Sequence, residues 1–498
     1  MHAPPAGTAA TLPPQQSVPA AQPAAEPARE SPYATPWWIW ALAGGLFFLY
    51  MTLSLRTHQR LLSHSYDLGI FDQVVRSYAA GRLPVSELKA PDFPILGDHF
   101  SPVLALLAPL YRLWPSAQTL LVAQAALVAA SVLPLTRWAH RTLGARAAVV
   151  TGLCYGLSWG IASGVGFDFH EVAFAVPLLA CSLAALGSGR LRAAAWWALP
   201  LVLVKEDLGL TVAAIGLVIV RRAGRGDRAG RRTGAALALA GAAGTLLATV
   251  VVLPAFNPGG AYAYLSYLGG GDAQGGGGFG DLLRKATVGM VTPETKVSTL
   301  VLVLAPSLFL ALRSPLVCVA LPTLLWRFAS GNSAHWGTGY HYSLVLMPIV
   351  FAAFVDALVR RRASGAAGAR RHLIGAAAMC VVLLPAFSLW RLAEPATWRT
   401  DPRIAVAHRL MDMIPDGATV QASDGLVPHL TQRTSTSLYG WPDSRPDPEW
   451  IIVDTTVAPE RRWPLSAQQE LIALDGARAQ GYRTAAQENG FVLLNRRS

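Results

Sequence analysis

Long runs of apolar residues, separated by short loops rich in arginine or in acids and histidines, make up most of this chain. The runs are about 17–22 residues long, which is the length an α-helix needs to cross the ~30 Å hydrocarbon core of a membrane. About eleven spans are predicted, near residues 37–55, 117–136, 145–161, 171–187, 191–204, 208–220, 234–254, 297–312, 314–329, 341–359 and 372–391. The predicted fold is therefore an all-α polytopic membrane bundle.

Two stretches depart from this simple pattern. The runs 191–204 and 208–220 are too short for two full crossings, and the charged segment KEDLG between them predicts a broken or tightly kinked helix pair. The run HFSPVLALLAPLYRLW, residues 99–114, fits a re-entrant segment, an interfacial helix or a further span equally well.

The two ends of the chain differ in character from the middle. Residues 1–36 are rich in Ala, Pro and Gln and bury too little surface to fold, so they are predicted to form a disordered tail. From residue 394 the polarity becomes ordinary, and helix-like and strand-like segments alternate, which predicts a small α/β domain with short parallel strands covered by helices. The predicted domains are the tail 1–36, a transmembrane domain 37–393 with a first loop at 56–116, and the α/β domain 394–498.

Composition and charge decide between a soluble and a membrane interpretation. The chain of 498 residues is 53% hydrophobic and only 14% charged, against roughly 25% charged residues in soluble proteins. Its net charge of +12 would suggest nucleic-acid binding in a soluble protein. One set of alternating short loops holds 17 Lys and Arg residues and the other set 5. By the positive-inside rule the first set is cytoplasmic, so the positive charge orients the chain and predicts no nucleic-acid partner.

The protein is thus predicted to span the plasma membrane. Residues 1–36 are predicted to lie inside the cell, and the first loop and the C-terminal domain outside. The first loop contains YDLGIFDQVVRSYAAGRLP, which predicts an amphipathic helix beginning near Asp67 and closing at Gly81. Asp67 and Asp72 are the candidate catalytic residues, because a carboxylate can act as general base on an acceptor hydroxyl. Asp67 is also interpreted as an N-cap of this helix, a role compatible with catalysis.

Other acids, histidines and bases gather at the same predicted outer face. Lys205 is a candidate for binding a lipid phosphate, with Glu206 or Asp207 holding it in place; a solvated turn is the alternative interpretation of this segment. The further candidate substrate- or phosphate-binding residues are Asp98, His99, His170, Glu171, Arg327, His335 and His341. The segments GDHF and FDFHE contain residue types that bind divalent metals, but their spacing matches no zinc motif such as HExxH. No resident cofactor is therefore predicted, and a divalent-metal site is the less favoured alternative.

These segments resemble those of the GT-C glycosyltransferases, membrane enzymes that use polyprenyl-phosphate sugars and include protein mannosyltransferases and aminoarabinose transferases of lipid A. Asp67, the helix to Ala80, Gly81 and then GDHFSPVL follow the order found in that group. KEDLG resembles its lysine-containing helix break, and HYSLVLMP, residues 341–348, resembles a segment of its later spans. The set YDLGIFDQ, GDHFSP, FHE and KEDLGL is more closely similar to an uncharacterised bacterial membrane-protein family known only by a domain-of-unknown-function number, over about residues 40–455.

The resemblance implies a polyprenyl-phosphate sugar as donor and a GT-C-like bundle. Many GT-C enzymes have an acidic pair after the first span, whereas this chain has Asp67-Leu68, so Asp72 would have to supply the second acid. Three hypotheses follow: a glycosyltransferase acting on an envelope glycan, lipid or protein at the outer face, with Lys205 and Arg327 on the donor phosphate; a transporter or polyprenyl-lipid-binding or flipping protein without transferase activity; and a non-enzymatic envelope protein whose bundle is an anchor.

Overall fold

The structure is a computed structural model that describes residues 1–3, 35–260, 262, 287–365 and 368–496. The chain divides into residues 1–36 and residues 37–498, and the second unit is described here. The predicted disordered tail lies almost wholly outside the described residues.

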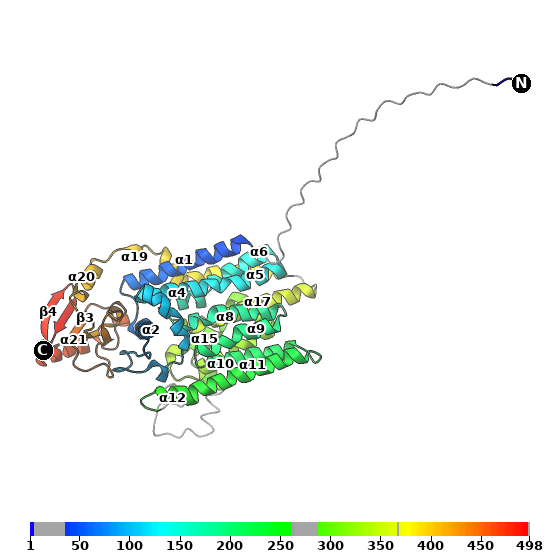
Figure 1. Ribbon diagram of the computed structural model, residues 1–498. Helices are drawn as coiled ribbons and strands as arrows, with labels where there is room; N and C mark the ends of the chain where they lie inside the picture. Colours follow the sequence, from blue (N-terminus) through cyan, green and yellow to red (C-terminus); the bar gives the residue numbers. More distant parts are fainter. Residues whose placement is uncertain (4–34, 261, 263–286, 366–367, 497–498) are drawn as a thin grey trace. The chain divides into compact units, whose positions relative to one another are not determined.

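Helices form most of residues 37–411 (Figure 1). They are α1 (Trp37–Gln59), α2 (Ile70–Ala79), α3 (Ala108–Leu113), α4 (Ala117–Ala130), α5 (Val132–Leu143), α6 (Ala145–Gly156), α7 (Trp159–Gly166), α8 (Ala175–Gly187), α9 (Leu191–Ala198), α10 (Leu208–Arg222), α11 (Arg228–Leu247), α12 (Leu253–Phe256), α15 (Glu294–Leu304), α16 (Leu321–Ala329), α17 (Leu346–Ala363), α18 (Ala369–Leu383), α19 (Pro395–Trp398) and α20 (Pro402–Met411). A further helix, α21 (Ala467–Ala479), belongs to the C-terminal α/β region.

Five helical stretches among the described residues are long and apolar enough to cross a membrane, or six if the bent pair α6–α7 counts as one span. The five are Trp37–Gln59, Ala117–Leu143, Arg228–Phe256, His341–Ala363 and Ala369–Ala386. Shorter apolar helices occupy Pro102–Leu113, Glu171–Gly187, Leu191–Leu203 and Pro315–Ala329. The protein is thus a multi-helix membrane protein, while the count of eleven spans stays a prediction.

Local sequence explains where several helices break. The predicted break at KEDLG is confirmed, because the segment before it ends at Leu203 and α10 begins at Leu208. The predicted helix over 297–312 is wrong in its second half. Pro306 lacks a backbone N–H, and Leu308 and Phe309 then adopt left-handed conformations with φ of 48° and 59°.

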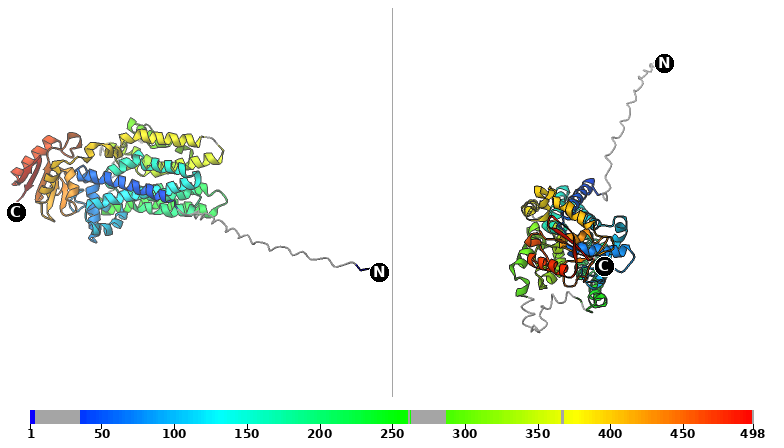
Figure 2. Two further views of the ribbon diagram at one scale, coloured as in Figure 1. Left: turned by 90° about the horizontal axis from the view of Figure 1, so that it is seen from above. Right: turned by 90° about the vertical axis from the view of Figure 1, so that its left-hand side faces the viewer.

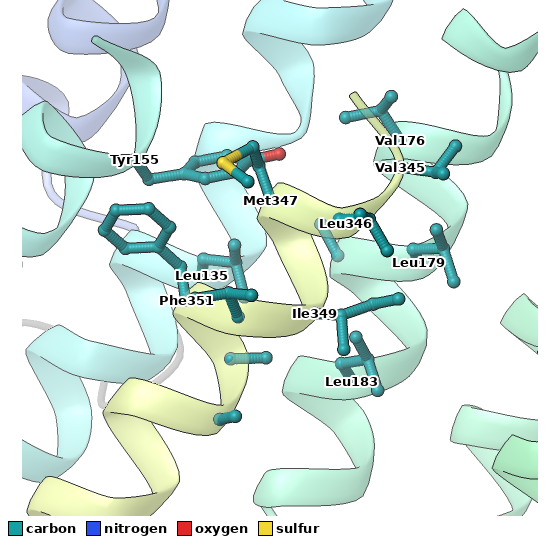
Figure 3. Close-up of a cluster of buried hydrophobic side chains, with 14 of the residues drawn as sticks. Leu135, Tyr155, Val176, Leu179, Leu183, Val345, Leu346, Met347, Ile349 and Phe351 are labelled. Carbon is teal, nitrogen blue, oxygen red and sulfur yellow. The ribbon is translucent and has the colours of Figure 1, made fainter. Parts of the chain in front are cut away.

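The hydrophobic core of the bundle surrounds α17. In the segment His341–Ala363, 89% of the most apolar stretch of 18 residues is buried inside the protein. In Ala369–Ala386 only 11% of the corresponding stretch is buried. Figure 3 shows side chains of α17, including Met347 and Phe351, among Tyr155 and aliphatic residues of neighbouring helices. The helix α17 is therefore the centre of the bundle, and α18 leaves most of its surface to lipid.

Helices α10 and α11 pack with almost no side chain between their backbones. A Cβ atom added at Gly216 would lie 2.6 Å from the carbonyl oxygen of Gly234 and 2.6 Å from the backbone nitrogen of Ala238. Gly209 and Gly241 approach each other in the same way. Small residues allow this close packing of helices in membranes, where apolar side chains gain little from contact with each other rather than with lipid.

Replacing Gly216 by alanine should therefore destabilise the protein by about 1–3 kcal/mol, because the two backbones must move apart. Thermal unfolding in detergent, followed by intrinsic fluorescence, measures this as a lowered Tm. Gly44→Ala is the matched control, since a Cβ at Gly44 meets nothing within 4 Å and alanine favours the helix. Equal Tm values for the two variants would contradict the close contact.

The C-terminal part contains a five-stranded sheet in the order β2-β1-β3-β5-β4. The strands are β1 (Thr419–Ala422), β2 (Ser435–Leu438), β3 (Trp450–Asp454), β4 (Arg483–Glu488) and β5 (Phe491–Asn495). β1 is parallel to β2 and β3, as predicted, but β5 is antiparallel to both β3 and β4. The expectation of an all-parallel sheet is wrong because Asn489-Gly490, with positive φ at both residues, makes a tight hairpin turn between β4 and β5.

The sheet region packs directly on the juxtamembrane helix α2. Residues of α2 such as Phe71 and Val74 share one buried cluster with Val406, Leu426 and Leu438 of the C-terminal part. Figures 1 and 2 show the strands next to α2, at one end of the helices. Arg445 also donates to both carboxylate oxygens of Glu87 in the first loop, at 2.9 and 3.0 Å.

Candidate active site

The candidate site begins at the turn that joins α1 to α2. Ser65–Gly69 forms a π-helical turn, in which Tyr66 is extended and Asp67 has a φ of 79°. The helix α2 begins at Ile70 and has no side-chain N-cap, so the interpretation of Asp67 as an N-cap is wrong. Gly81, with φ 68°, follows the end of α2 as predicted. The unusual backbone at Asp67 directs its carboxylate toward a histidine instead of toward the helix.

A chain of four charged side chains connects the first loop with two later helix ends. Oδ2 of Asp67 lies 2.9 Å from Nε2 of His170, and Nδ1 of His170 lies 3.2 Å from Oε2 of Glu171. Oε1 of Glu171 accepts a hydrogen bond of 2.7 Å from Nζ of Lys205. His170 and Glu171 are almost fully buried, whereas the side chain of Asp67 is 24% exposed. Asp67 is thus the end of the chain that solvent or a substrate can reach.

The electrostatics of this chain keep Asp67 ionised. Burial lowers the pKa of His170, but the carboxylates of Asp67 and Glu171 outweigh it and raise the pKa to about 9. Burial likewise raises the pKa of Asp67, and the adjacent His170 outweighs that effect, so the net shift is downward. At neutral pH the pair is therefore an aspartate beside an imidazolium, and the Asp67 carboxylate can accept a proton or a hydrogen bond.

His341 adds a third side chain to the exposed end of this chain. Its ring stacks on that of His170 with centroids 3.2 Å apart. One ligand atom each from Asp67, His170 and His341 lies within 4.8 Å of the others, a set that could hold a divalent cation. The two histidines and one carboxylate come from the first loop and from two distant helix ends, so no local spacing could reveal the group. The absence of a resident metal stays a prediction.

Asp98 and His99 form a second cluster near the first. Oδ2 of Asp98 lies 2.6 Å from Nδ1 of His99 and 2.8 Å from Nζ of Lys89. Phe71 contacts the rings of both His99 and His170, with centroids 6.1 and 5.3 Å away. Burial raises the pKa of Asp98, but His99 and Lys89 outweigh it and hold the pKa far below its usual range.

The two acids that follow Lys205 face other partners. Glu206 accepts hydrogen bonds from the backbone N–H of Phe100, at 3.3 Å, and from the hydroxyl of Tyr262, at 3.2 Å. Burial and then the neighbouring Glu206 raise the pKa of Asp207 to about 7. Glu171, 34 positions away, holds Lys205 through the 2.7 Å hydrogen bond, and the role predicted for Glu206 or Asp207 stays a prediction.

Arg327 stabilises a loop inside the bundle, and His335 is part of that loop. The buried guanidinium of Arg327 donates to the carbonyl oxygens of His335, at 2.8 Å, and of Gly337, at 2.9 Å. It also donates to Oγ of Ser343, at 3.2 Å. This loop leads into His341, so Arg327 helps to position the histidine that stacks on His170. Direct contact of Arg327 with a phosphate stays a prediction.

Asp72 belongs to a different cluster from Asp67. Asp72 is fully buried in α2. The hydroxyls of Thr431 and Tyr111 and the guanidinium of Arg76 are the nearby groups that favour its ionised form. Neither carboxylate oxygen has a hydrogen bond of ordinary geometry within the described residues. Burial raises the pKa of Asp72 to about 6.

The Asp72→Asn variant should be more stable at pH 7 by about 1–3 kcal/mol, because it removes a buried carboxylate that must ionise there. The folded protein keeps this proton up to about pH 6, whereas an ordinary aspartate releases it near 3.8. Stability of the wild type should therefore fall as pH rises from 4 to 6, and that slope should flatten in the variant. Tm across this pH range measures both effects, and full sugar-transfer activity of the variant would remove Asp72 from the catalytic candidates.

His64 and Ser65, just before Asp67, are residues of the site region that lie outside the sequence candidates. His64 donates its backbone N–H to Oδ2 of Asp168, at 2.9 Å, and its ring Nδ1 lies 2.8 Å from the same oxygen. Asp424 of the C-terminal part accepts hydrogen bonds from the N–H and the hydroxyl of Ser65, at 2.7 and 2.5 Å. These contacts join residues 104 and 359 positions apart, so local sequence spacing does not reveal them.

Apolar helices, a small mixed sheet packed on their ends and a buried chain of charged side chains define a class: multi-helix membrane proteins with a C-terminal α/β region. More particularly, the chain belongs to the family described as Predicted membrane protein (DUF2079), which matches residues 57–493. The sequence resemblance to an uncharacterised numbered family is thereby confirmed.

One solved structure shares the fold, and a second was compared. ArnT from Cupriavidus metallidurans bound to undecaprenyl phosphate is similar over 93% of this chain and 98% of that one, with a TM-score of 0.56 and 14% identity. The apo state of the same protein gives a TM-score of 0.49, 14% identity, and coverage of 91% and 98%. No curated protein matches the sequence. The GT-C-like fold predicted from the sequence is thus confirmed, with its small C-terminal sheet.

Proposed function

We propose that this protein is a membrane glycosyltransferase that transfers a sugar from a polyprenyl-phosphate donor to a glycan, lipid or protein of the cell envelope at the outer face of the membrane. The observation that carries the proposal is the partly exposed carboxylate of Asp67 at the end of the buried chain His170, Glu171 and Lys205. The fold shared with ArnT bound to undecaprenyl phosphate supports a polyprenyl-phosphate lipid as partner.

In this proposal Asp67 is the general base. The acceptor hydroxyl attacks the anomeric carbon of the donor, its proton passes to Asp67, and the bond from that carbon to the phosphate oxygen breaks. The configuration at the anomeric carbon inverts, and the polyprenyl phosphate leaves with the electron pair of the broken bond. His170 keeps Asp67 ionised until the hydroxyl arrives, and general-base catalysis of this kind contributes about 10²–10⁴ in rate.

Lys205 is proposed to place its ammonium group near the donor phosphate. It lies at the break between the 3₁₀ segment Leu199–Leu203 and α10, and Glu171 fixes its direction through the 2.7 Å hydrogen bond. An ammonium group binds phosphate as a point charge. A lysine held at a helix break beside the site can therefore stabilise the negative charge of the leaving phosphate.

The second candidate is a protein that binds or moves polyprenyl lipids without transferring sugar. The observation in its favour is the helix break at 204–207, because transporters commonly place their binding sites at broken helices. In that case the Lys205 cluster would bind the phosphate and Asp67 would have no chemical role.

The test uses the full chain in proteoliposomes with radiolabelled polyprenyl-phosphate sugars and an envelope extract as acceptor. A labelled product that depends on Asp67 supports the transferase. Movement of the labelled lipid between the two leaflets, with no covalent product and no dependence on Asp67, would support the second candidate and overturn the first.

A further inference from the structure

A polar pocket of about 200 Å³ lies where the C-terminal sheet meets the end of α1. Its floor is formed where two neighbouring parallel strands end: Ser423 and Asp424 follow β1, and Asp454 ends β3. The chain runs from β1 out to β2 and returns to β3 on the other side of β1. In open α/β sheets, ligands bind at the carboxyl ends of the strands at such a reversal of strand order.

The walls of the pocket come from three further segments. Arg60 and Leu61 follow α1, Arg403 belongs to α20, and Arg461 to Trp463 follow β3. The indole of Trp463 is 41% exposed and packs against Tyr66, with ring centroids 5.0 Å apart. The pocket therefore combines guanidinium groups, carboxylates and one aromatic ring, and the bundle contributes one of its walls.

Two of the four arginines already have partners. Arg403 pairs with Asp454 at 2.6 Å, and Arg462 pairs with Glu470 at 2.6 Å. Within the described residues, Arg60 and Arg461 have no carboxylate oxygen within 4.0 Å. Oδ1 of nearby Asp424 accepts hydrogen bonds from the backbone N–H and the hydroxyl of Ser65. Among the described residues, the pocket thus holds two guanidinium groups that form no direct ion pair and can bind an anion.

We propose that this pocket binds an acidic monosaccharide unit, with its carboxylate or phosphate on Arg461 and Arg60 and its ring against Trp463. Guanidinium groups bind planar or tetrahedral anions through paired N–H donors. The carboxylate oxygens of Asp401 and Asp454 accept hydrogen bonds from sugar hydroxyls, and an exposed indole offers an apolar face to a pyranose ring. The volume suits a single sugar unit.

The position of the pocket gives the bound sugar a role. Asp424 lines the pocket and at the same time holds Ser65, two residues before Asp67. Resting on the proposed function, this assigns the pocket as a recognition site for the acceptor, so that an acidic envelope glycan is anchored beside the general base. Binding itself does not depend on the transfer reaction.

The test is direct binding to the full chain in lipid nanodiscs, by calorimetry and saturation-transfer NMR, with glucuronate, glucose 6-phosphate, glucose and inorganic phosphate as probes. At least one acidic sugar should bind at least tenfold more tightly than glucose and than inorganic phosphate. Arg461→Ala should weaken that binding about 10- to 100-fold, as expected for loss of a hydrogen-bonded charge. Arg409→Ala, an exposed arginine paired with Glu488, is the matched control and should leave it unchanged.

The outcomes separate this proposal from the transferase. The proposed sugar site would be refuted if neither acidic sugar bound, or if glucose bound equally well. An unchanged affinity in folded Arg461→Ala would also refute it. Inorganic phosphate binding as tightly as the sugars would also overturn it, leaving a plain anion site. Asp67→Asn should keep the binding while losing transfer; an Asp67→Asn protein that still transfers sugar refutes the proposed function and leaves the pocket intact.

Discussion

The Asp67→Asn variant should lose sugar transfer by about 10²–10⁴-fold while its Tm stays close to that of the wild type. The amide keeps the size of the side chain and can still contact His170, but it cannot take the proton of the acceptor hydroxyl. Initial rates with radiolabelled polyprenyl-phosphate sugar measure the loss. It should appear in kcat, with the KM for the donor nearly unchanged, because Asp67 is not proposed to bind the phosphate.

The matched control for this experiment is Asp443→Asn, which removes an exposed carboxylate from the C-terminal part. It should leave both the rate and Tm unchanged. Full activity of Asp67→Asn would remove the general base from the proposal. A large drop in its Tm would show that the pair with His170 is needed mainly to hold the first loop in place.

Glu171→Gln should give the largest loss of stability among single changes in the site. Glu171 is fully buried, and its two oxygens face Lys205 at 2.7 Å and His170 at 3.2 Å. Removing one partner of a buried ion pair leaves the other charge uncompensated and costs about 3–5 kcal/mol. Thermal unfolding in detergent should show this as a strongly lowered Tm.

A double variant separates this effect from simple loss of packing. Lys205→Met in the Glu171→Gln background removes the uncompensated charge, so the double variant should unfold at a higher temperature than Glu171→Gln alone. Asp475→Asn, which breaks an exposed ion pair with Arg478, is the matched surface control. Additive effects of Glu171→Gln and Lys205→Met would contradict direct coupling between the two side chains.

Much of the architecture could be predicted because it depends on local patterns. Apolar runs of membrane length, the break at KEDLG and the glycine after α2 are all visible over a few residues. The alternation of helices and strands in the C-terminal part is confirmed, but the expectation of parallel strands holds only for β1, β2 and β3. The Asn489-Gly490 turn was the available signal for the antiparallel hairpin.

The site was harder to predict, because its contacts depend on how distant segments meet. The sequence placed Asp67, His170, Glu171 and Lys205 in one list of candidates at one face, and the structure joins them in one chain. It did not reveal the hydrogen bond between Lys205 and Glu171. Asp356 is likewise a buried acid in a predicted span, and its contact with Arg222 also joins distant segments. It forms ion pairs with Arg222 and Arg360, at 2.7 and 2.8 Å.

The hydrogen bonds from Ser65 to Asp424 have a consequence for how the protein is made. They join residues 359 positions apart, and the juxtamembrane helix α2 packs on the same C-terminal part. Domains generally fold as units during synthesis, N-terminal part first. The spans can therefore insert into the membrane before Asp424 stabilises the turn that holds Asp67. The hydrogen bonds from Ser65 to Asp424 form only when the last hundred residues have emerged and folded. A ribosome that stops before the sheet is complete therefore leaves an inserted protein in which the turn at Asp67 lacks these hydrogen bonds.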